Sequence, residues 1–151
     1  AVATPHSPFQ WGARLVSTVP LLSDDAASPR ARAVFDDIRA TRQTDHVNNF
    51  WRALAADPAL LESTWAEVKR VMGQPSALDA LTKELIYVAV SVANGCSYCV
   101  HSHTASARAR GMSAAQHADL LAVVGLAART NHLATALQVP VDPVFDAEAG
   151  T

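Results

Sequence analysis

The sequence has few charged residues and none of several common enzyme motifs. Asp, Glu, Lys and Arg make up 17% of its 151 residues, against about 25% in an average soluble domain. The formal net charge is −2, and neither a basic stripe nor a run of like charges occurs. No GxGxxG, P-loop or nucleophile-elbow motif occurs either. We therefore predict no nucleic-acid partner.

Long apolar segments are also missing. The longest core segment without Asp, Glu, Lys or Arg runs from Leu85 to Ala107. Its uniformly apolar part is only about ten residues long, whereas a membrane span needs about 20. The first residues do not combine a basic region with an apolar core, as a secretory signal does. We predict a cytoplasmic protein without membrane association.

The low charge contrasts with a hydrophobic content of 50%. A chain of 16.0 kDa is large enough to bury a core within one domain. Too few charged residues remain to cover the surface of such a monomer, so part of the apolar area is expected to be buried between subunits. We predict a homo-oligomer.

Helix signals recur along the chain, without any strand pattern. Ser28 and Pro29, for example, open a helix as N-cap and first residue, and Gly125 is a possible break within the last helix. The predicted helices cover about residues 28–40, 47–57, 58–73, 77–94, 96–111 and 113–137. We predict an all-α, single-domain bundle of about six helices at residues 23–142, between an extended arm at 1–22 and a tail at 143–151.

The chain has two cysteines, Cys96 and Cys99, in the segment NGCSYCVHSH at residues 94–103. In a cytoplasmic protein a lone CxxC is more typical of redox or metal chemistry than of a structural disulfide. The pair follows Gly95 at a predicted helix start, where unpaired N–H groups and the macrodipole stabilise a thiolate. A reactive thiol pair is therefore expected.

Two further residues are placed to complete a site. His103 follows Cys99 by one helical turn, so Cys96, Cys99 and His103 share one stripe of a helix. If the chain reverses at Gly95, Glu84 lies roughly one turn from His103, on the order of 5 Å along the axis. Carboxylate, imidazole and thiol together are typical of a nucleophile activated by an oriented base.

Other interpretations of these residues stay open. The four side chains of Cys96, Cys99, His103 and Glu84 are suitable zinc ligands, although a second cysteine pair is missing. A second alternative is that the two thiols are buried and inert. Glu84 could separately be a solvated surface residue. A third alternative is a non-enzymatic redox sensor that is oxidised once and then changes its assembly.

The spacing E-x11-C-x2-C-x3-H, from Glu84 to His103, resembles the signature of the alkylhydroperoxidase D-like (AhpD-like) branch of the carboxymuconolactone decarboxylase family. The segment LTKELIYVAVSVANGCSYCVHSHTASARARGMS is similar to the core segment of that family. VNNFWRALAADPALL and NHLATALQVP resemble its peroxidase-related members. The likeness covers roughly residues 20–142.

This resemblance implies an all-helical protein assembled as trimers or hexamers, with thiol peroxidase activity toward organic hydroperoxides or hydrogen peroxide. It implies no metal, haem or flavin, and an external dithiol reductant, which is a thiol or lipoyl-type protein. By the same resemblance Cys99 attacks the peroxide, Cys96 resolves the sulfenic acid to a disulfide, and Glu84 and His103 relay protons.

Two residues near the pair depart from this pattern or add to it. Tyr98 stands where a histidine precedes the second cysteine in other family members, so the resemblance does not identify the reductant. His101 is an additional histidine, which we interpret as a surface residue. The decarboxylating branch of the family lacks the cysteine pair, so lactone decarboxylation is not expected.

Overall fold

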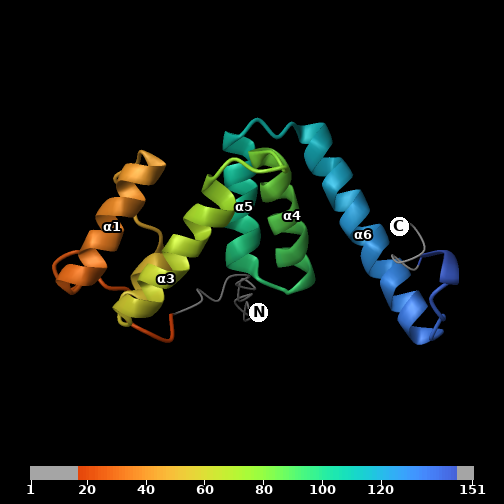
Figure 1. The fold of residues 1–151 in the computed structure, drawn as a ribbon, viewed down its shortest axis with the longest axis horizontal. Coiled ribbons are helices and arrows are strands. Elements are labelled where there is room, and N and C mark those ends of the chain that lie inside the picture. The colour runs from red at the N-terminus through yellow and green to blue at the C-terminus, as the bar shows by residue number, and fades with distance from the viewer. Residues whose placement is uncertain (1–16, 146–151) are drawn as a thin grey trace, which may run out of the picture. The chain divides into compact units, whose positions relative to one another are not determined.

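The computed structural model describes residues 17–145 and contains helices but no strand in that range (Figure 1). The α-helices are α1 (Pro29–Arg42), α2 (Asn49–Leu54), α3 (Pro58–Val68), α4 (Ala80–Ala93), α5 (Ser97–Ala109) and α6 (Ala114–Ala136). A π-helical turn, Lys69–Gly73, follows α3, and a 3-10 turn occupies Pro143–Phe145. The predicted all-α class with about six helices is confirmed.

Side-chain caps mark the starts of all the α-helices described except α2. The Ser28 hydroxyl accepts a hydrogen bond from the N–H of Ala31, and Pro29 is the first residue of α1, as predicted. Ser113 and Gln116 form a reciprocal capping box at the start of α6. These helices therefore begin where their own sequence satisfies the unpaired N–H groups.

Several helix limits differ by a few residues from the sequence prediction, and two differences concern the course of a helix. The segment predicted as one helix at 58–73 is α-helical only to Val68 and then becomes a π-helical turn. The helix α6 runs through Gly125 without interruption. A single glycine costs only about 1 kcal/mol relative to alanine within a helix, which is too little to divide a helix of 23 residues.

The chain divides by its internal contacts into two compact units, Ala1–Val71 and Met72–Thr151. The single domain predicted at residues 23–142 spans both units, and its limits stay a prediction. Of the predicted arm at 1–22, only residues 17–22 are described, and they form no helix. The predicted tail at 143–151 is described as far as residue 145.

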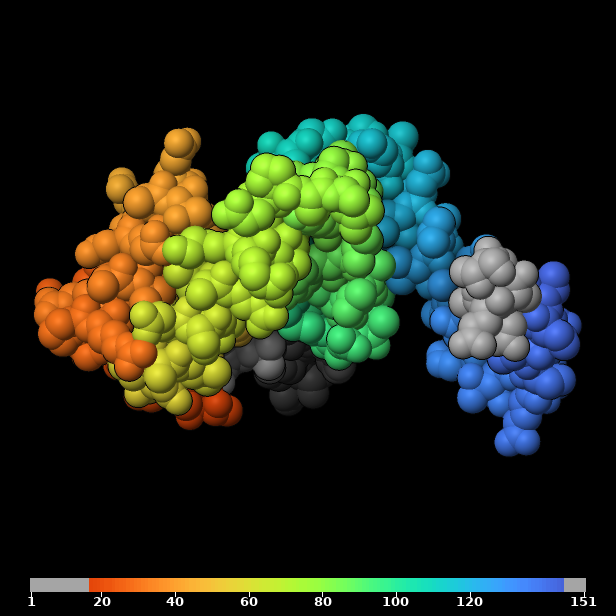
Figure 2. Space-filling view, viewed as in Figure 1, coloured from red at the N-terminus to blue at the C-terminus, as the bar shows by residue number. Residues whose placement is uncertain are grey.

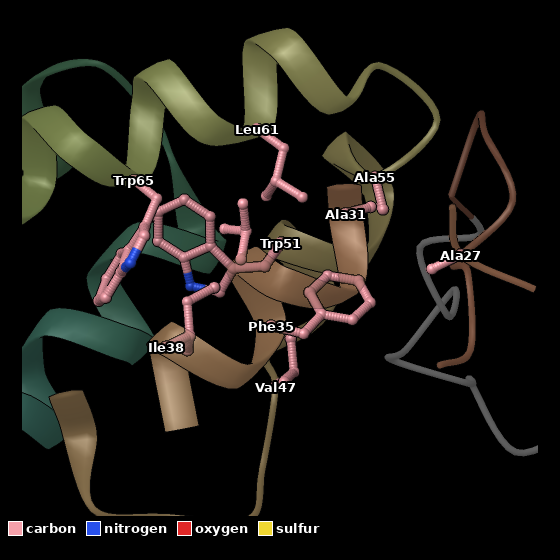
Figure 3. Packing of buried hydrophobic residues seen from close by; sticks show 10 residues of the cluster. Ala27, Ala31, Phe35, Ile38, Val47, Trp51, Ala55, Leu61 and Trp65 are labelled. Atoms are coloured by element: carbon pink, nitrogen blue, oxygen red, sulfur yellow. The ribbon is translucent and has the colours of Figure 1, made fainter. Parts of the chain in front are cut away.

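The first unit has an apolar core between α1, α2 and α3. Phe35 and Ile38 of α1, Trp51 of α2, and Leu61 and Trp65 of α3 are at most 4% exposed (Figure 3). The rings of Trp51 and Trp65 meet edge to face, with centroids 5.3 Å apart. Phe35, Trp51 and Trp65 are thus the aromatic residues of this core.

The second unit is built on the hairpin of α4 and α5, which lie side by side (Figure 1). The chain reverses at Gly95, whose φ of +68° is unfavourable for residues with a Cβ atom. The backbone N–H of Cys96 then bonds to the carbonyl of Ser91 and fixes the start of α5. This reversal, predicted from Gly95, brings the middle of α4 beside α5.

The helix α6 packs against α4 yet buries none of its own residues within the described part of the chain. In the space-filling view its C-terminal half, drawn in blue, extends away from α4 and α5 (Figure 2). Several of its large apolar side chains are at least 49% exposed: Leu121, Val123, Leu126 and Leu133. Across residues 17–145, no helix is both long enough and apolar enough to cross a bilayer.

Candidate active site

The two cysteines are joined by a disulfide at the N-terminus of α5. Their Cα atoms are 5.3 Å apart. Cys96 is the N-cap residue, and its sulfur accepts a hydrogen bond of 3.3 Å from the backbone N–H of Cys99. Both sulfurs therefore lie in the first turn, where the N–H groups and the helix dipole favour a thiolate once the bond is reduced.

Glu84 is the buried ionisable residue of the described chain, with 4% exposure. Its Oε2 lies 2.7 Å from Nδ1 of His103. The alternative of a solvated Glu84 is therefore wrong. The side chain of His103 is 22% exposed, so the pair connects a buried carboxylate to an imidazole that reaches solvent.

The second carboxylate oxygen of Glu84 has a cation as its partner. Arg110 Nε donates to Oε1 over 3.2 Å, and the side chain of Arg110 is 41% exposed. A buried carboxylate without a charged partner would be strongly destabilising. Because both oxygens are bonded, the carboxylate is held in one orientation between Arg110 and His103.

Tyr87 stacks on the imidazole. The ring centroids of Tyr87 and His103 are 3.5 Å apart and the planes are inclined by 17°. Tyr87 follows Glu84 by three residues, so both occupy the same side of α4. The carboxylate fixes one ring nitrogen and the phenol ring fixes the plane, which leaves His103 little freedom to rotate.

The arrangement of His103 relative to the thiols follows from the helix. His103 lies four residues after Cys99 in α5, which is about 6 Å along the axis on the same face. Since Nδ1 is bonded to Glu84, Nε2 is the nitrogen that is available for proton exchange. His101 is exposed, and Tyr98 is 43% exposed.

A metal site does not form from these residues in the described structure. Among residues 17–145, no three His, Cys, Asp or Glu side chains are placed to share a metal ion. The two sulfurs that the zinc interpretation requires are bonded to each other. The structure thus brings together Cys96 with Cys99, and Glu84 with His103.

Sequence reasoning missed Arg110 and Tyr87. The signal for Arg110 was present, because an acidic residue inside an apolar helix needs a cation nearby. The basic turn at residues 108–110 also suits a helix C-terminus, so it does not by itself point to Glu84. Tyr87 could have been found from its spacing of three residues from Glu84.

Known proteins and one family model are similar to this chain. Residues 58–142 match the model of the carboxymuconolactone decarboxylase family. An uncharacterized protein of Cupriavidus necator is 36% identical over 83 residues, which are 55% of this chain and 73% of that protein. The crystal structure of an alkylhydroperoxidase AhpD core from Rhodospirillum rubrum is 62% identical, with a TM-score of 0.83, and the match covers 85% of this chain and 96% of that chain.

Fold and site together define a class of all-helical proteins with a CxxC pair at a helix start, close to a buried glutamate and its histidine. The chain belongs to the carboxymuconolactone decarboxylase family, as an AhpD-like member. The family resemblance inferred from the sequence is confirmed.

Proposed function

We propose that this protein is a thiol peroxidase of the alkylhydroperoxidase type, which reduces organic hydroperoxides or hydrogen peroxide. The observation that carries the proposal is the disulfide between Cys96 and Cys99 on the same helix as His103, which is bonded to the buried Glu84. The Rhodospirillum rubrum structure, which is 62% identical and bears the name alkylhydroperoxidase, supports this reaction class.

The proposed cycle begins with the reduced pair. The Cys99 thiolate attacks one peroxide oxygen, so that an S–O bond forms, the O–O bond breaks and an alkoxide leaves. The alkoxide takes a proton and becomes an alcohol. Cys96 then attacks the sulfenic sulfur of Cys99, which releases water and forms the disulfide.

The proton path uses His103 and Glu84. Nε2 of His103 takes the proton from the Cys99 thiol and later delivers it to the departing alkoxide. Glu84 holds Nδ1 at 2.7 Å, which orients Nε2 and stabilises the imidazolium while it carries the proton. Cys96 loses its own proton when it attacks, and this proton leaves with the water.

The electrons that regenerate the two thiols come from outside the chain. Two electrons from an external dithiol reduce the disulfide, and we propose a thiol or lipoyl-type protein as this partner and no resident cofactor. A reducing compartment such as the cytoplasm would keep such a donor supplied. We also propose a homo-oligomer, a trimer or a hexamer, in which the apolar side chains exposed on α6 are covered.

Rapid mixing of the reduced protein with an organic hydroperoxide tests the activity. We expect the loss of two thiols and two mass units per chain, and rapid recovery on addition of a dithiol. Thiols that react only once, without turnover in excess dithiol, would favour the redox sensor. Unreactive thiols together with bound zinc in the reduced protein would establish the zinc site and reject the peroxidase.

A further inference from the structure

We propose that Arg110 is a positioning residue, which acts through Glu84 to keep His103 ready to accept the Cys99 proton. The inference deepens the proposed function, because it concerns the base that serves the thiol. Arg110 itself approaches neither substrate nor sulfur in this role. It donates to Glu84, and Glu84 contacts the imidazole.

The geometry makes Arg110 a fixed partner of the carboxylate. Arg110 is the C-cap residue of α5, and its backbone N–H bonds to the carbonyls of Ser106 and Ala107. The next residue, Gly111, turns the chain with a φ of +90°. The guanidinium therefore extends from an anchored helix end to Oε1 of Glu84, opposite the oxygen that meets His103.

Counting charges shows what the cation does. With Arg110 present, the ion pair with Glu84 is neutral as a whole. Without Arg110, the negative charge of a carboxylate that is only 5% exposed has no cation to offset it. A buried carboxylate without its cation is drawn toward water or other donors, so its bond to Nδ1 of His103 loses its fixed direction. An imidazole that is no longer held in place is a weaker base toward Cys99.

Other ionisable groups in this unit do not replace Arg110. Lys83 of α4 donates to the carbonyl of Gln74, and Arg108 of α5 is exposed. The helix packed on α4, α6, carries four ionisable residues: His117, Asp119, Arg129 and His132. Within residues 17–145, none of these six forms a hydrogen bond or ion pair with Glu84 or His103.

The test measures alkylation of Cys99 by iodoacetamide in the fully reduced protein, as a function of pH. We expect Arg110→Gln to react about tenfold more slowly at neutral pH, the scale of a weakened general base. Its profile should move to higher pH and reach the same plateau. Arg110→Lys should recover most of the rate. Arg108→Gln, which removes the same charge from the same helix end, should match the wild type.

A second comparison establishes the route through the carboxylate. In a Glu84→Gln background, adding Arg110→Gln should slow the reaction no further, since the group through which the cation acts is gone. Equal slowing in both backgrounds, or an unchanged profile in Arg110→Gln, would overturn the proposal. Arg110→Met is a second neutral variant if the glutamine form does not fold.

The alkylation measurement distinguishes a failure of this inference from a failure of the proposed peroxidase activity. If the wild type does not react with peroxide but its thiol alkylation depends on Arg110 as described, the peroxidase activity is rejected and the positioning role is supported. If the wild type turns over peroxide and Arg110→Gln has a normal alkylation profile, only the positioning role fails.

Discussion

At the scale of the residue, the site depends on how one buried carboxylate is neutralised. Glu84 bonds Arg110 through one oxygen and His103 through the other. The carboxylate therefore gains hydrogen bonds in place of the water it loses on burial. The bond to Nδ1 also orients the imidazole, so the contacts that make the burial of Glu84 tolerable hold the base of the proposed reaction in place.

Replacing the cysteines separately should distinguish their roles. We expect Cys99→Ser to abolish peroxide turnover, because the attacking thiolate is gone. Cys96→Ser should be oxidised once, to a sulfenic acid, and then stop, because no thiol resolves it. Intact mass and thiol counts after one equivalent of hydroperoxide measure both. Normal cycling of Cys96→Ser with a dithiol would show that the two roles are assigned wrongly.

The relay residues should affect rate rather than folding. His103→Gln removes the proposed proton carrier, and Glu84→Gln removes the carboxylate that holds it. A general base typically increases the reaction rate 10²- to 10⁴-fold. We expect oxidation of Cys99 at neutral pH to slow by at least about tenfold in each variant. Circular dichroism and thermal unfolding check the fold. His101→Gln, which changes an exposed histidine two residues away, serves as the control.

At the scale of the element, Asp37 connects α1 to the end of α3. It accepts a hydrogen bond of 2.7 Å from the indole N–H of Trp65 and pairs with the ammonium group of Lys69. The pairing with Lys69, followed by the bond from Trp65, holds the pKa of Asp37 below its ordinary value. This polar contact lies at the edge of the apolar core of the first unit.

The lowered pKa of Asp37 predicts a pH-dependent stability. Its contribution is fully present above the ordinary carboxyl pKa and is lost as the pH falls through the lower, folded-state value. We expect Asp37→Asn to lower the free energy of unfolding at neutral pH by at most about 1 kcal/mol, since both partners are more than a third exposed.

Denaturant unfolding at neutral and at strongly acidic pH checks this expectation. The difference between wild type and Asp37→Asn should shrink as the pH falls, because the wild-type carboxyl is then protonated too. Asp25→Asn, at an exposed position just before α1, is the control. A difference of constant size at both pH values would contradict the assigned cause.

The CxxC pair and the approach of Glu84 to His103 could be predicted from the sequence, and the particular cation that pairs with Glu84 could not. The CxxC pair, the turn from Cys99 to His103 and the reversal at Gly95 depend on helical spacing and on one glycine. The contact between Arg110 and Glu84 joins residues 26 apart. It depends on how α4 and α5 lie against each other, which spacing along one helix does not specify.

The helix starts could be predicted because their signals are local. Capping residues and proline act within one turn, so the starts of α1 and α6 could be located from the sequence. The π-helical turn after Val68 and the uninterrupted passage of α6 through Gly125 could not. A glycine within a helical pattern carries an energy too small to decide by itself whether the helix ends.

At the scale of the whole molecule, α6 carries exposed apolar side chains that have no partner within the described chain. Val123 and Leu126 are 64% and 62% exposed, and Leu133 and Leu137 continue the same stripe at 50% and 73%. At 100° per residue these four side chains lie within about 80° of one another. Water does not favour such a continuous apolar stripe on a single chain, and a second subunit would cover it.

Replacing Leu126 by glutamate should therefore weaken assembly. A charge at the centre of an apolar interface remains partly unsolvated, so we expect Leu126→Glu to shift the mass in solution toward the monomer. Ala128→Glu adds the same charge on the opposite face of α6, where it should leave the assembly unchanged. Light scattering coupled to size-exclusion chromatography measures both. If the wild type is already a monomer, or if both variants dissociate alike, the stripe is not the interface, and the exposed leucines of α6 have another role.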